Sequence, residues 1–424
     1  MHRLNELERL LFDEIAQIPI LDTHSHINPL SPAAQSLDDL LGYHYFTELA
    51  HSSGLAKKTL EAQTNPRGRT RLILGFANHF RNTVQFEWLE DIARNFIGFM
   101  GEQITFDDGD KLWTLAERRM SQPDWATQVL RNSRIERIFL TNDFDDPLTG
   151  FDSSIYIPCL RVDDLVFHLH QPGTRERLAR FTNNGWGDTR SLSRSLSLLF
   201  QHFISHNARA CAISLPPDFA PEPVSAQTLD ALLHKPALDA KDLTCLQNGV
   251  FWLIAEKCNE HQLPMQLMIG VNRKVYPQGV YQGQDLFDQR TSLIQYAALF
   301  NHFPDVRFFI SVLTSMQNQE LASYSWIFPN VLTHGHWWYS NIPALIYRDS
   351  QLRLQAVPIS KQIGYYSDAY KLEFILPKYN MYRQTLVRIL AEDFIQQRGW
   401  TETQAIELAR QLLHDNANAL FGFA

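Results

Sequence analysis

Two histidines at the end of a short apolar segment are the residues best placed for chemistry in this sequence. His24 and His26 follow the run Pro19–Thr23, whose apolar residues are typical of a buried β-strand. Residues two apart on a strand point to the same face, so both imidazoles would face one pocket. Neutral imidazole nitrogens are common ligands of divalent metal ions. The spacing therefore predicts a metal site at the end of this strand.

The His-x-His spacing alone is a weak indication, because histidine is common in this chain. The sequence contains 16 histidines, and two further pairs have the same spacing, His168/His170 and His334/His336. His24 and His26 differ from these because Asp22 precedes them and a compact apolar run carries them. We therefore interpret His24 and His26 as the metal-binding pair.

Asp368 is the predicted third ligand. It lies in Tyr366–Ala369, after an apolar segment near the end of the chain. Two imidazoles and one carboxylate form a mononuclear site that leaves coordination positions open for a substrate. Taken alone, Asp368 has the competing interpretation of a turn residue or a helix cap. The ligand set accepts zinc, manganese, iron or cobalt.

Further candidate residues follow other predicted strands. Arg161 ends the apolar run Tyr156–Leu160, and a buried guanidinium needs a partner. A substrate carboxylate and the nearby Asp163 are equally good candidates for that partner. Trp337 and Trp338 would either line a sugar-sized pocket or pack in the core, as tryptophan usually does.

Strand-like and helix-like segments alternate along the chain. The predicted strands are Ile18–Thr23, Ile135–Thr141, Tyr156–Val162, Ala210–Leu215, Pro264–Val271, Arg307–Leu313, Val331–Trp337 and Leu354–Ile359. Gly364–Ala369 is an alternative end for the last strand. Helical patterns such as Leu243–His261 and Ser292–Phe303 lie between them. This alternation predicts an α/β fold, a (β/α)8 TIM barrel.

A long segment separates the first two strands. Residues 34–130 contain four helical patterns, at Leu37–His51, Lys58–Gln63, Val84–Gly98 and Lys111–Met120. We interpret this segment as a helical insertion over the barrel mouth, where active sites form. The alternative is a separate helical domain without a role in chemistry. The chain then divides into 1–33 (N-terminal helix and first strand), 34–130 (insertion) and 131–424 (the remainder of the barrel and the C-terminal helices).

His44 and Tyr45 lie within this insertion, in the sequence Tyr43-His44-Tyr45. An imidazole and a phenol held over the barrel mouth are suited to acid–base chemistry. Without the metal site, the same residues would be interpreted as a packed helix face.

Composition limits the functions that the chain can have. Its 424 residues carry a net charge of −8, which provides no basic surface for nucleic acid or for an anionic membrane. Four cysteines without CxxC spacing indicate neither a zinc ribbon nor a disulfide framework, and favour a reduced cytoplasmic setting. Acidic residues near the N-terminus argue against a signal peptide. Whether the chain forms a homo-oligomer is not predicted.

Eight short segments together carry a family resemblance. They are Asp22–His26, Gly42–Phe46, Leu140–Asp143, Leu160–Asp163, Ile213–Pro217, Met268–Val271, Gly335–Trp338 and Ser367–Ala369. In this order, and spread along nearly the whole chain, they resemble the uronate isomerases (glucuronate or galacturonate isomerases) of the amidohydrolase superfamily.

The resemblance implies a distorted barrel with one divalent metal ion, usually zinc. It implies that His24 and His26 bind the metal, and that Asp368 binds it or acts as a base. The residues expected to face the sugar acid are His44, Tyr45, Arg161, Trp337 and Trp338. The family reaction interconverts D-glucuronate and D-fructuronate, or D-galacturonate and D-tagaturonate. For that chemistry we expect Asp368 and Tyr45 to share proton transfers through an enediol.

One position departs from the family pattern. Family members usually carry an arginine two residues after the aspartate of the eighth strand, whereas this chain has Tyr370 followed by Lys371. Loss of that guanidinium should weaken or move the recognition of a carboxylate. Arg273 or Lys274 would compensate, or the substrate is a different sugar acid.

Two other classes of function remain as alternatives. A mononuclear metal-dependent amidohydrolase or decarboxylase would use metal-bound water, with Asp368 as the base. Residues 210–215 contain no lysine and residues 264–271 no histidine, which argues against a binuclear hydrolase. The second alternative is a barrel that binds a ligand without catalysis.

Overall fold

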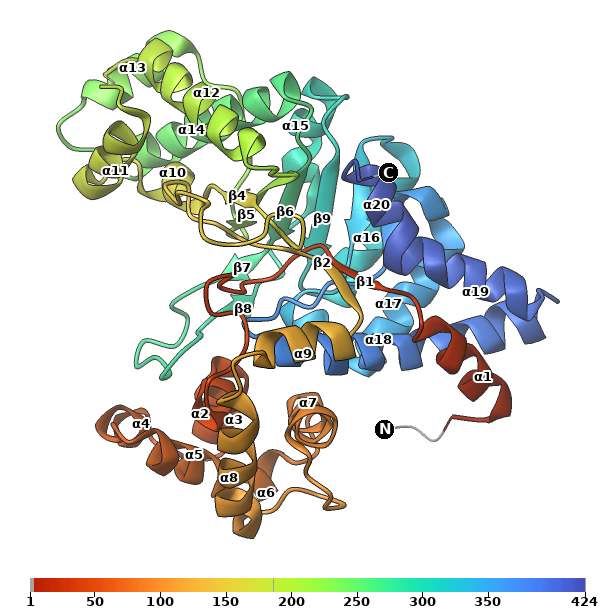
Figure 1. The fold of residues 1–424 in the computed structure, drawn as a ribbon. Helices are drawn as coiled ribbons and strands as arrows, with labels where there is room; N and C mark the ends of the chain where they lie inside the picture. Colours follow the sequence, from red (N-terminus) through yellow and green to blue (C-terminus); the bar gives the residue numbers. More distant parts are fainter. Residues whose placement is uncertain (1–3, 186, 424) are drawn as a thin grey trace.

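Parallel strands in the predicted chain order form the centre of the molecule (Figure 1). The structure, a computed structural model, describes residues 4–185 and 187–423. One sheet has the order β1 (Ile20–Asp22), β2 (Ile135–Phe139), β3 (Tyr156–Ile157). The other has the order β11 (Gln362–Ile363), β10 (Val331–His334), β9 (Phe308–Val312), β6 (Met265–Ile269), β5 (Ala210–Leu215), β4 (Cys159–Arg161). The predicted α/β barrel is confirmed.

The barrel is distorted at two places. β3 and β4 are the two halves of the predicted strand Tyr156–Val162, and they are separated by Pro158, which has no N–H to donate. A parallel bridge between Asn142 and Leu160 connects the two sheets there. At the opposite seam, β1 and β11 are connected by the chain beyond their ends. His26 N donates to the Ala369 carbonyl at 2.8 Å.

Helices surround these strands (Figure 1). They are α1 (Glu6–Ile15), α9 (Trp125–Asn132), α10 (Asp163–His168), α11 (Pro172–Thr182), α12 (Thr189–Ser205), α13 (Ala226–His234), α14 (Ala240–Glu260), α15 (Ala297–His302), α16 (Ser315–Ile327), α17 (Pro343–Ala356), α18 (Ile375–Ile389), α19 (Glu402–Arg410) and α20 (Asn416–Leu420). Short 3-10 or π-helical turns are η1 (Ala93–Ile97), η2 (Phe106–Asp108), η3 (Leu293–Tyr296), η4 (Trp338–Ser340), η5 (Ile359–Lys361), η6 (Leu372–Phe374), η7 (Leu390–Gln396) and η8 (Gln411–Asp415). Within the described residues, every helix is too short or too polar to cross a membrane.

The predicted last strand, Leu354–Ile359, is wrong. Its first three residues belong to α17, and the eighth strand position is β11, directly before the alternative segment Gly364–Ala369. The helix was missed because it buries polar side chains, Asp349, Ser350 and Arg353, where an apolar stripe would mark a helix.

The insertion consists of short helices that pack on the barrel. They are α2 (Leu37–Leu41), α3 (His44–Ser52), α4 (Lys57–Ala62), α5 (Pro66–Leu74), α6 (Ala77–Phe80), α7 (Val84–Ile92) and α8 (Gly109–Met120). The predicted helix Leu37–His51 is thus interrupted at Gly42 and Tyr43. Figure 1 shows these helices, in red to orange, grouped on one side of the barrel. One hydrophobic cluster contains both Phe46 of the insertion and Leu386 of α18, so the two regions share a core.

An antiparallel hairpin of β7 (Val271–Asn272) and β8 (Leu286–Phe287) also reaches the insertion. Gln284 N in its connecting loop donates to the Glu48 carboxylate of α3 at 3.2 Å. The side chain of Glu48 lies against Gly283, where an added Cβ would meet its carboxylate oxygen at 1.6 Å. Glycine is therefore required at this contact between the loop and α3.

Glu373 connects both ends of the insertion to the barrel. Its buried carboxylate accepts from Ala34 N at 2.9 Å and from Trp125 Nε1 at 2.7 Å. Burial raises the pKa of Glu373 to about 7, although hydrogen bonds from the backbone and from Trp125 oppose the shift. The hydrogen bonds that Glu373 accepts thus connect Ala34 and Trp125 to the C-terminal part of the barrel, and they depend on its carboxylate oxygens.

Replacing Glu373 should destabilise the protein according to the acceptors that remain. Glu373→Ala leaves two buried donors unsatisfied, at about 1–3 kcal/mol each. Glu373→Gln keeps one acceptor oxygen and should lose less. Urea unfolding monitored by circular dichroism measures both losses. Equal unfolding midpoints for Glu373→Ala and the wild type would show that the hydrogen bonds of Glu373 do not stabilise the protein.

The same glutamate predicts a pH dependence. Its native pKa of about 7 exceeds the value of 4.5 expected for an unfolded chain, so the native state binds more protons between these pH values. The free energy of unfolding of the wild type therefore falls as pH rises through this range. Glu373→Gln lacks this contribution, so its stability relative to the wild type should improve from pH 5 to pH 8. An unchanged difference would show that Glu373 titrates normally.

Candidate metal centre and active site

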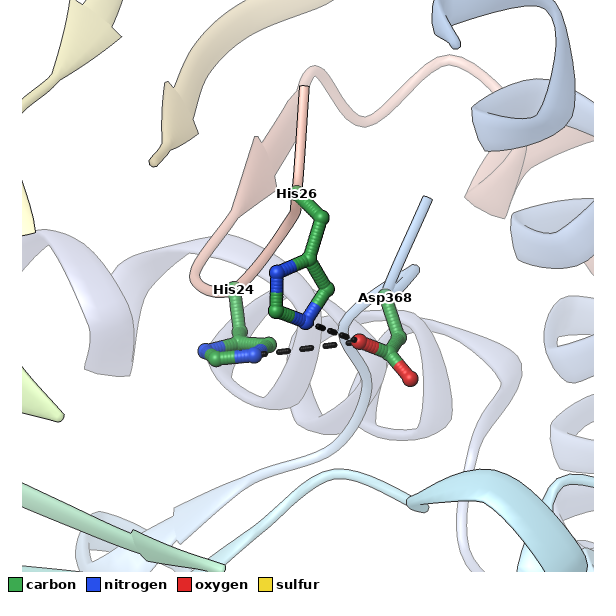
Figure 2. A group of neighbouring side chains, drawn as sticks. All are labelled: His24, His26 and Asp368. Atoms are coloured by element: carbon green, nitrogen blue, oxygen red, sulfur yellow. Dashed lines mark ion pairs between the residues drawn. The ribbon is translucent and has the colours of Figure 1, made fainter. Parts of the chain in front are cut away.

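Three side chains from the first and last strand positions meet at the seam of the barrel (Figure 2). Asp368 Oδ1 lies 3.3 Å from His26 Nε2 and 3.7 Å from His24 Nε2. His24 and Asp368 are almost fully buried, and the imidazole of His26 is partly exposed. The structure therefore brings together the three residues predicted as metal ligands.

Gln266 of β6 fixes the tautomer of His24. The Gln266 Nε2 group donates to the Thr23 carbonyl at 2.8 Å, which leaves Gln266 Oε1 as an acceptor. His24 Nδ1 donates to that oxygen at 2.9 Å. With its hydrogen on Nδ1, neutral His24 presents the Nε2 lone pair toward Asp368.

Thr141, just after β2, has the same effect on His26. Its hydroxyl donates to the Ser25 carbonyl at 3.0 Å, so its oxygen accepts from His26 Nδ1 at 2.7 Å. His26 Nε2 then also carries a lone pair that faces Asp368. Partners of this kind orient metal-binding histidines in many proteins.

The donor atoms that converge here could together hold a metal ion. His24 Nε2 and Asp368 Oδ1 are buried without a hydrogen-bond partner. Burial lowers the pKa of His24 to about 3, so this imidazole is neutral at pH 7. Burial acts to raise the pKa of Asp368, whereas the charge of Lys378 acts to lower it. Two nitrogens and an ionised oxygen at these separations fit the tetrahedral coordination of an ion such as zinc.

The backbone at Asp368 is left-handed, with φ of 52°. Aspartate tolerates this region better than most residues. Asp368 N donates to the His24 carbonyl at 3.1 Å, and the Tyr45 hydroxyl donates to the Asp368 carbonyl at 2.8 Å. Tyr45 of α3 in the insertion is thus held against Asp368.

His44 lies beside Tyr45 with its Nε2 buried and unpartnered. Its ring centroid is 4.5 Å from that of Trp338. Burial lowers the pKa of His44 to about 3, so it is a neutral hydrogen-bonding group at pH 7. The predicted acid–base pair of the insertion therefore reaches the centre, with His44 uncharged.

The two tryptophans have different environments. Trp338 lines a cavity of about 130 Å³ together with Tyr45, Asp368 and Lys378. Trp337 packs into a hydrophobic cluster with Met268, Val271, Leu313 and Tyr366.

Arg161 and Arg273 line a second, larger cavity of about 610 Å³, which Lys274 also reaches. Arg161 Nε donates to Asp163 at 3.1 Å, so the internal partner considered from the sequence is present. Arg273 Nε donates to Asp285 at 3.2 Å. Both guanidiniums retain further N–H groups that can bind an anion in this cavity.

Tyr370 lies two residues after Asp368, where the family resemblance leads us to expect an arginine. Its ring stacks on His26 with centroids 4.9 Å apart. The following Lys371 donates to the carbonyl of Ser31 at 3.1 Å, so its ammonium is used by the backbone. An aromatic wall therefore stands beside His26 at this position.

The other His-x-His pairs are bonded elsewhere. His334 Nε2 shares a hydrogen bond with Thr23 Oγ1 at 2.8 Å, and His336 Nε2 shares one with Ser350 at 3.0 Å. His168 ends α10 and pairs with Gln171. The choice of His24 and His26 among the three pairs agrees with this geometry.

Sequence reasoning gave no supporting role to Gln266, Thr141 or Lys378, which bond to His24, to His26 and to the Ser367 carbonyl. Asp22, noted in the sequence beside the histidines, accepts hydrogen bonds from Ser367. Gln266 was detectable as the polar residue of the apolar strand Met265–Ile269. Lys378 has no comparable mark, because its partners are distant in the sequence.

Comparison with known proteins identifies the family. Residues 2–421 match the family model described as glucuronate isomerase. The chain belongs to the glucuronate isomerase family. This confirms the predicted family and the prediction that the protein is an isomerase.

Relatives of the family cover nearly the whole chain. The uronate isomerase of Nostoc punctiforme is 23% identical over 98% of this chain and 95% of its own. The solved uronate isomerase of Thermotoga maritima has a TM-score of 0.89 at 17% identity, covering 99% of this chain and 98% of its own. The solved glucuronate isomerase of Caulobacter crescentus also has a TM-score of 0.89, at 18% identity. The match covers 98% of this chain and 94% of the Caulobacter crescentus chain.

The Thr141 hydrogen bond predicts a change in metal affinity. Thr141→Val keeps the shape of the side chain but removes the acceptor for His26 Nδ1. Metal affinity should fall about 10–100-fold, as for other such partners of ligating histidines. Competition with a chromophoric chelator measures the metal affinity. His26→Ala, which removes a predicted metal ligand, gives the reference value for a lost ligand.

Thr114→Val is the matched control, because the Thr114 hydroxyl donates to the backbone carbonyl of Asp110 within α8. If Thr141→Val and Thr114→Val bound metal equally well, the assigned role of Thr141 would be wrong.

Proposed function

We propose that the protein is a metal-dependent aldose–ketose isomerase. It interconverts a hexuronate and its keto form, D-glucuronate and D-fructuronate or D-galacturonate and D-tagaturonate. The observation that carries this proposal is the convergence of His24, His26 and Asp368 in a chain of the glucuronate isomerase family. The relatives named above support the sugar-acid class of substrate.

His24, His26 and Asp368 would hold one divalent ion, with zinc favoured and manganese, iron or cobalt as alternatives. Their unpartnered, buried donor atoms support this assignment. When bound, the ion supplies a positive charge to the substrate oxygens on which negative charge develops. The site is mononuclear: the position of β6 beside His24 is occupied by Gln266, which bonds to that imidazole.

Aldose–ketose isomerisation moves a proton between C2 and C1 through an enediol of the substrate. Figure 2 shows the second oxygen of Asp368 directed away from the imidazoles, where it remains available to accept a proton. The Tyr45 hydroxyl is held at the Asp368 carbonyl, within the same cavity. We assign the two transfers to Asp368 and Tyr45. His44, neutral and unpartnered, is suited to a hydrogen bond with a sugar hydroxyl.

The remaining residues are assigned to the substrate. Arg161 and Arg273 are suited to the uronate carboxylate, because they line one cavity and retain free N–H groups. Trp338 would pack against the sugar ring, with Trp337 supporting it from the core. The insertion then serves as the cover of the mouth, since it supplies His44 and Tyr45.

Isomerisation in deuterated water tests the proposal. Metal-loaded protein should convert glucuronate or galacturonate to its ketose, with deuterium exchange at the migrating hydrogen followed by NMR. Asp368→Asn should lose activity by several orders of magnitude, since it removes a ligand charge and a base.

Asp152→Asn is the matched control, because Asp152 is exposed and bonds to Ser154. It should retain full activity. Absence of both ketose and exchange with the wild type on both substrates would refute the isomerase assignment.

A further inference from the structure

Lys378 of α18 is a fully buried lysine beside the metal centre, and the chemistry described above gives it no role. Its Nζ donates to the Tyr45 hydroxyl oxygen and to the Ser367 carbonyl, both at 2.6 Å. It also lies 4.4 Å from the ring centroid of Tyr45 and 4.7 Å from that of Trp88. Burying an ammonium is costly without such partners, so these contacts define its position.

These contacts lead to Asp368. Because the Tyr45 oxygen accepts from Lys378, its hydroxyl hydrogen is directed to the Asp368 carbonyl at 2.8 Å. Lys378 thus holds the Ser367 carbonyl directly and the Asp368 carbonyl through Tyr45. Asp368 lies between these two contacts. Its left-handed φ of 52° directs its carboxylate toward the imidazoles of His24 and His26.

Lys378 also lies near a second buried carboxylate. Asp22 accepts from both the backbone N and the hydroxyl of Ser367, at 2.7 Å for the backbone contact. Ser367 is therefore held on one side by Asp22 and on the other by Lys378. The Lys378 ammonium offsets part of the negative charge of the two aspartates buried here, Asp22 and Asp368.

We propose that Lys378 is a positioning residue of the isomerase centre. Through Tyr45 and the Ser367 carbonyl, it maintains the turn that aims the Asp368 carboxylate at the two imidazoles. This role rests on the proposed function, since it takes Asp368 as a metal ligand. It also makes metal geometry depend on the docking of α3, because Tyr45 belongs to the insertion.

Lys378→Met tests this role, because it keeps the aliphatic length and removes the three donors. Zinc affinity, measured by chelator competition, should fall about 10–100-fold. The visible absorption of the cobalt-substituted protein should change in band position and intensity, since the carboxylate ligand moves. A merely structural lysine would change the unfolding midpoint and leave the cobalt spectrum unaltered.

Lys361→Met is the matched control. The Lys361 ammonium also donates to two backbone carbonyls, those of Ser325 and Phe328, but at the start of β11, at the opposite end of that strand from Asp368. This variant should keep the wild-type zinc affinity and cobalt spectrum. If Lys361→Met altered the cobalt spectrum as much as Lys378→Met does, the positioning role would be refuted.

Tyr45→Phe provides a second test, because it removes one oxygen from the same connection. It should weaken zinc binding and change the cobalt spectrum in the same direction. The double variant should lose less affinity than the sum of the two single losses, since both act through one contact. If Tyr45→Phe kept the zinc affinity and the cobalt spectrum of the wild type, the proposal would be overturned. This test remains valid if Lys378→Met fails to fold.

The wild type separates this proposal from the proposed function. A wild-type protein that binds no divalent metal, or that isomerises neither uronate, refutes the proposed function. A wild-type protein that does both, with unchanged metal binding in Lys378→Met and Tyr45→Phe, refutes the role of Lys378 alone.

Discussion

Two imidazole nitrogens and a carboxylate oxygen that face one another in a buried site repel unless a cation lies between them. His24 Nε2 and His26 Nε2 lie within 4 Å of Asp368 Oδ1, and each imidazole is held in this orientation by a hydrogen bond on its other nitrogen. A proton on one nitrogen would satisfy a single contact, whereas a divalent ion satisfies all three. The hydrogen bonds of Gln266 and Thr141 hold both imidazoles in the orientation in which their Nε2 atoms face Asp368, as partners of metal-binding histidines do.

The barrel supplies this convergence from segments that are distant in the sequence. The chain passes from β1 into His24 and His26, and from β11 into Asp368, and these two segments bond to each other at the seam. From the insertion, the Tyr45 hydroxyl donates to the Asp368 carbonyl. Lys378 of α18 donates both to the Tyr45 oxygen and to the Ser367 carbonyl. The Lys378 ammonium lies near both buried aspartates, Asp22 and Asp368, and offsets part of their charge. The metal centre and the packing of the insertion are therefore parts of one arrangement.

The sequence predicted the parts of the site that depend on local periodicity. The alternation expected of a strand pointed to His24 and His26, although both lie just beyond β1, which ends at Asp22. Asp368 was recognisable because it follows a strand position of the same barrel. The last strand was placed wrongly at Leu354–Ile359, because α17 buries Asp349, Ser350 and Arg353 and so lacks an apolar stripe. Thr141 and Lys378 could not be predicted, since their roles come from contacts across the barrel. The choice of an isomerase came from the family resemblance, as residue chemistry alone also allowed a mononuclear hydrolase.

Anomalous diffraction from crystals grown with zinc tests the metal centre most directly. Data collected above and below the zinc absorption edge should give one strong difference peak at the seam of the barrel. The peak should lie about 2.0–2.2 Å from both imidazole Nε2 atoms and from Asp368 Oδ1, the distances of zinc bound by nitrogen and oxygen. A fully occupied peak at another histidine pair, such as His334 and His336, with none between His24, His26 and Asp368, would contradict it.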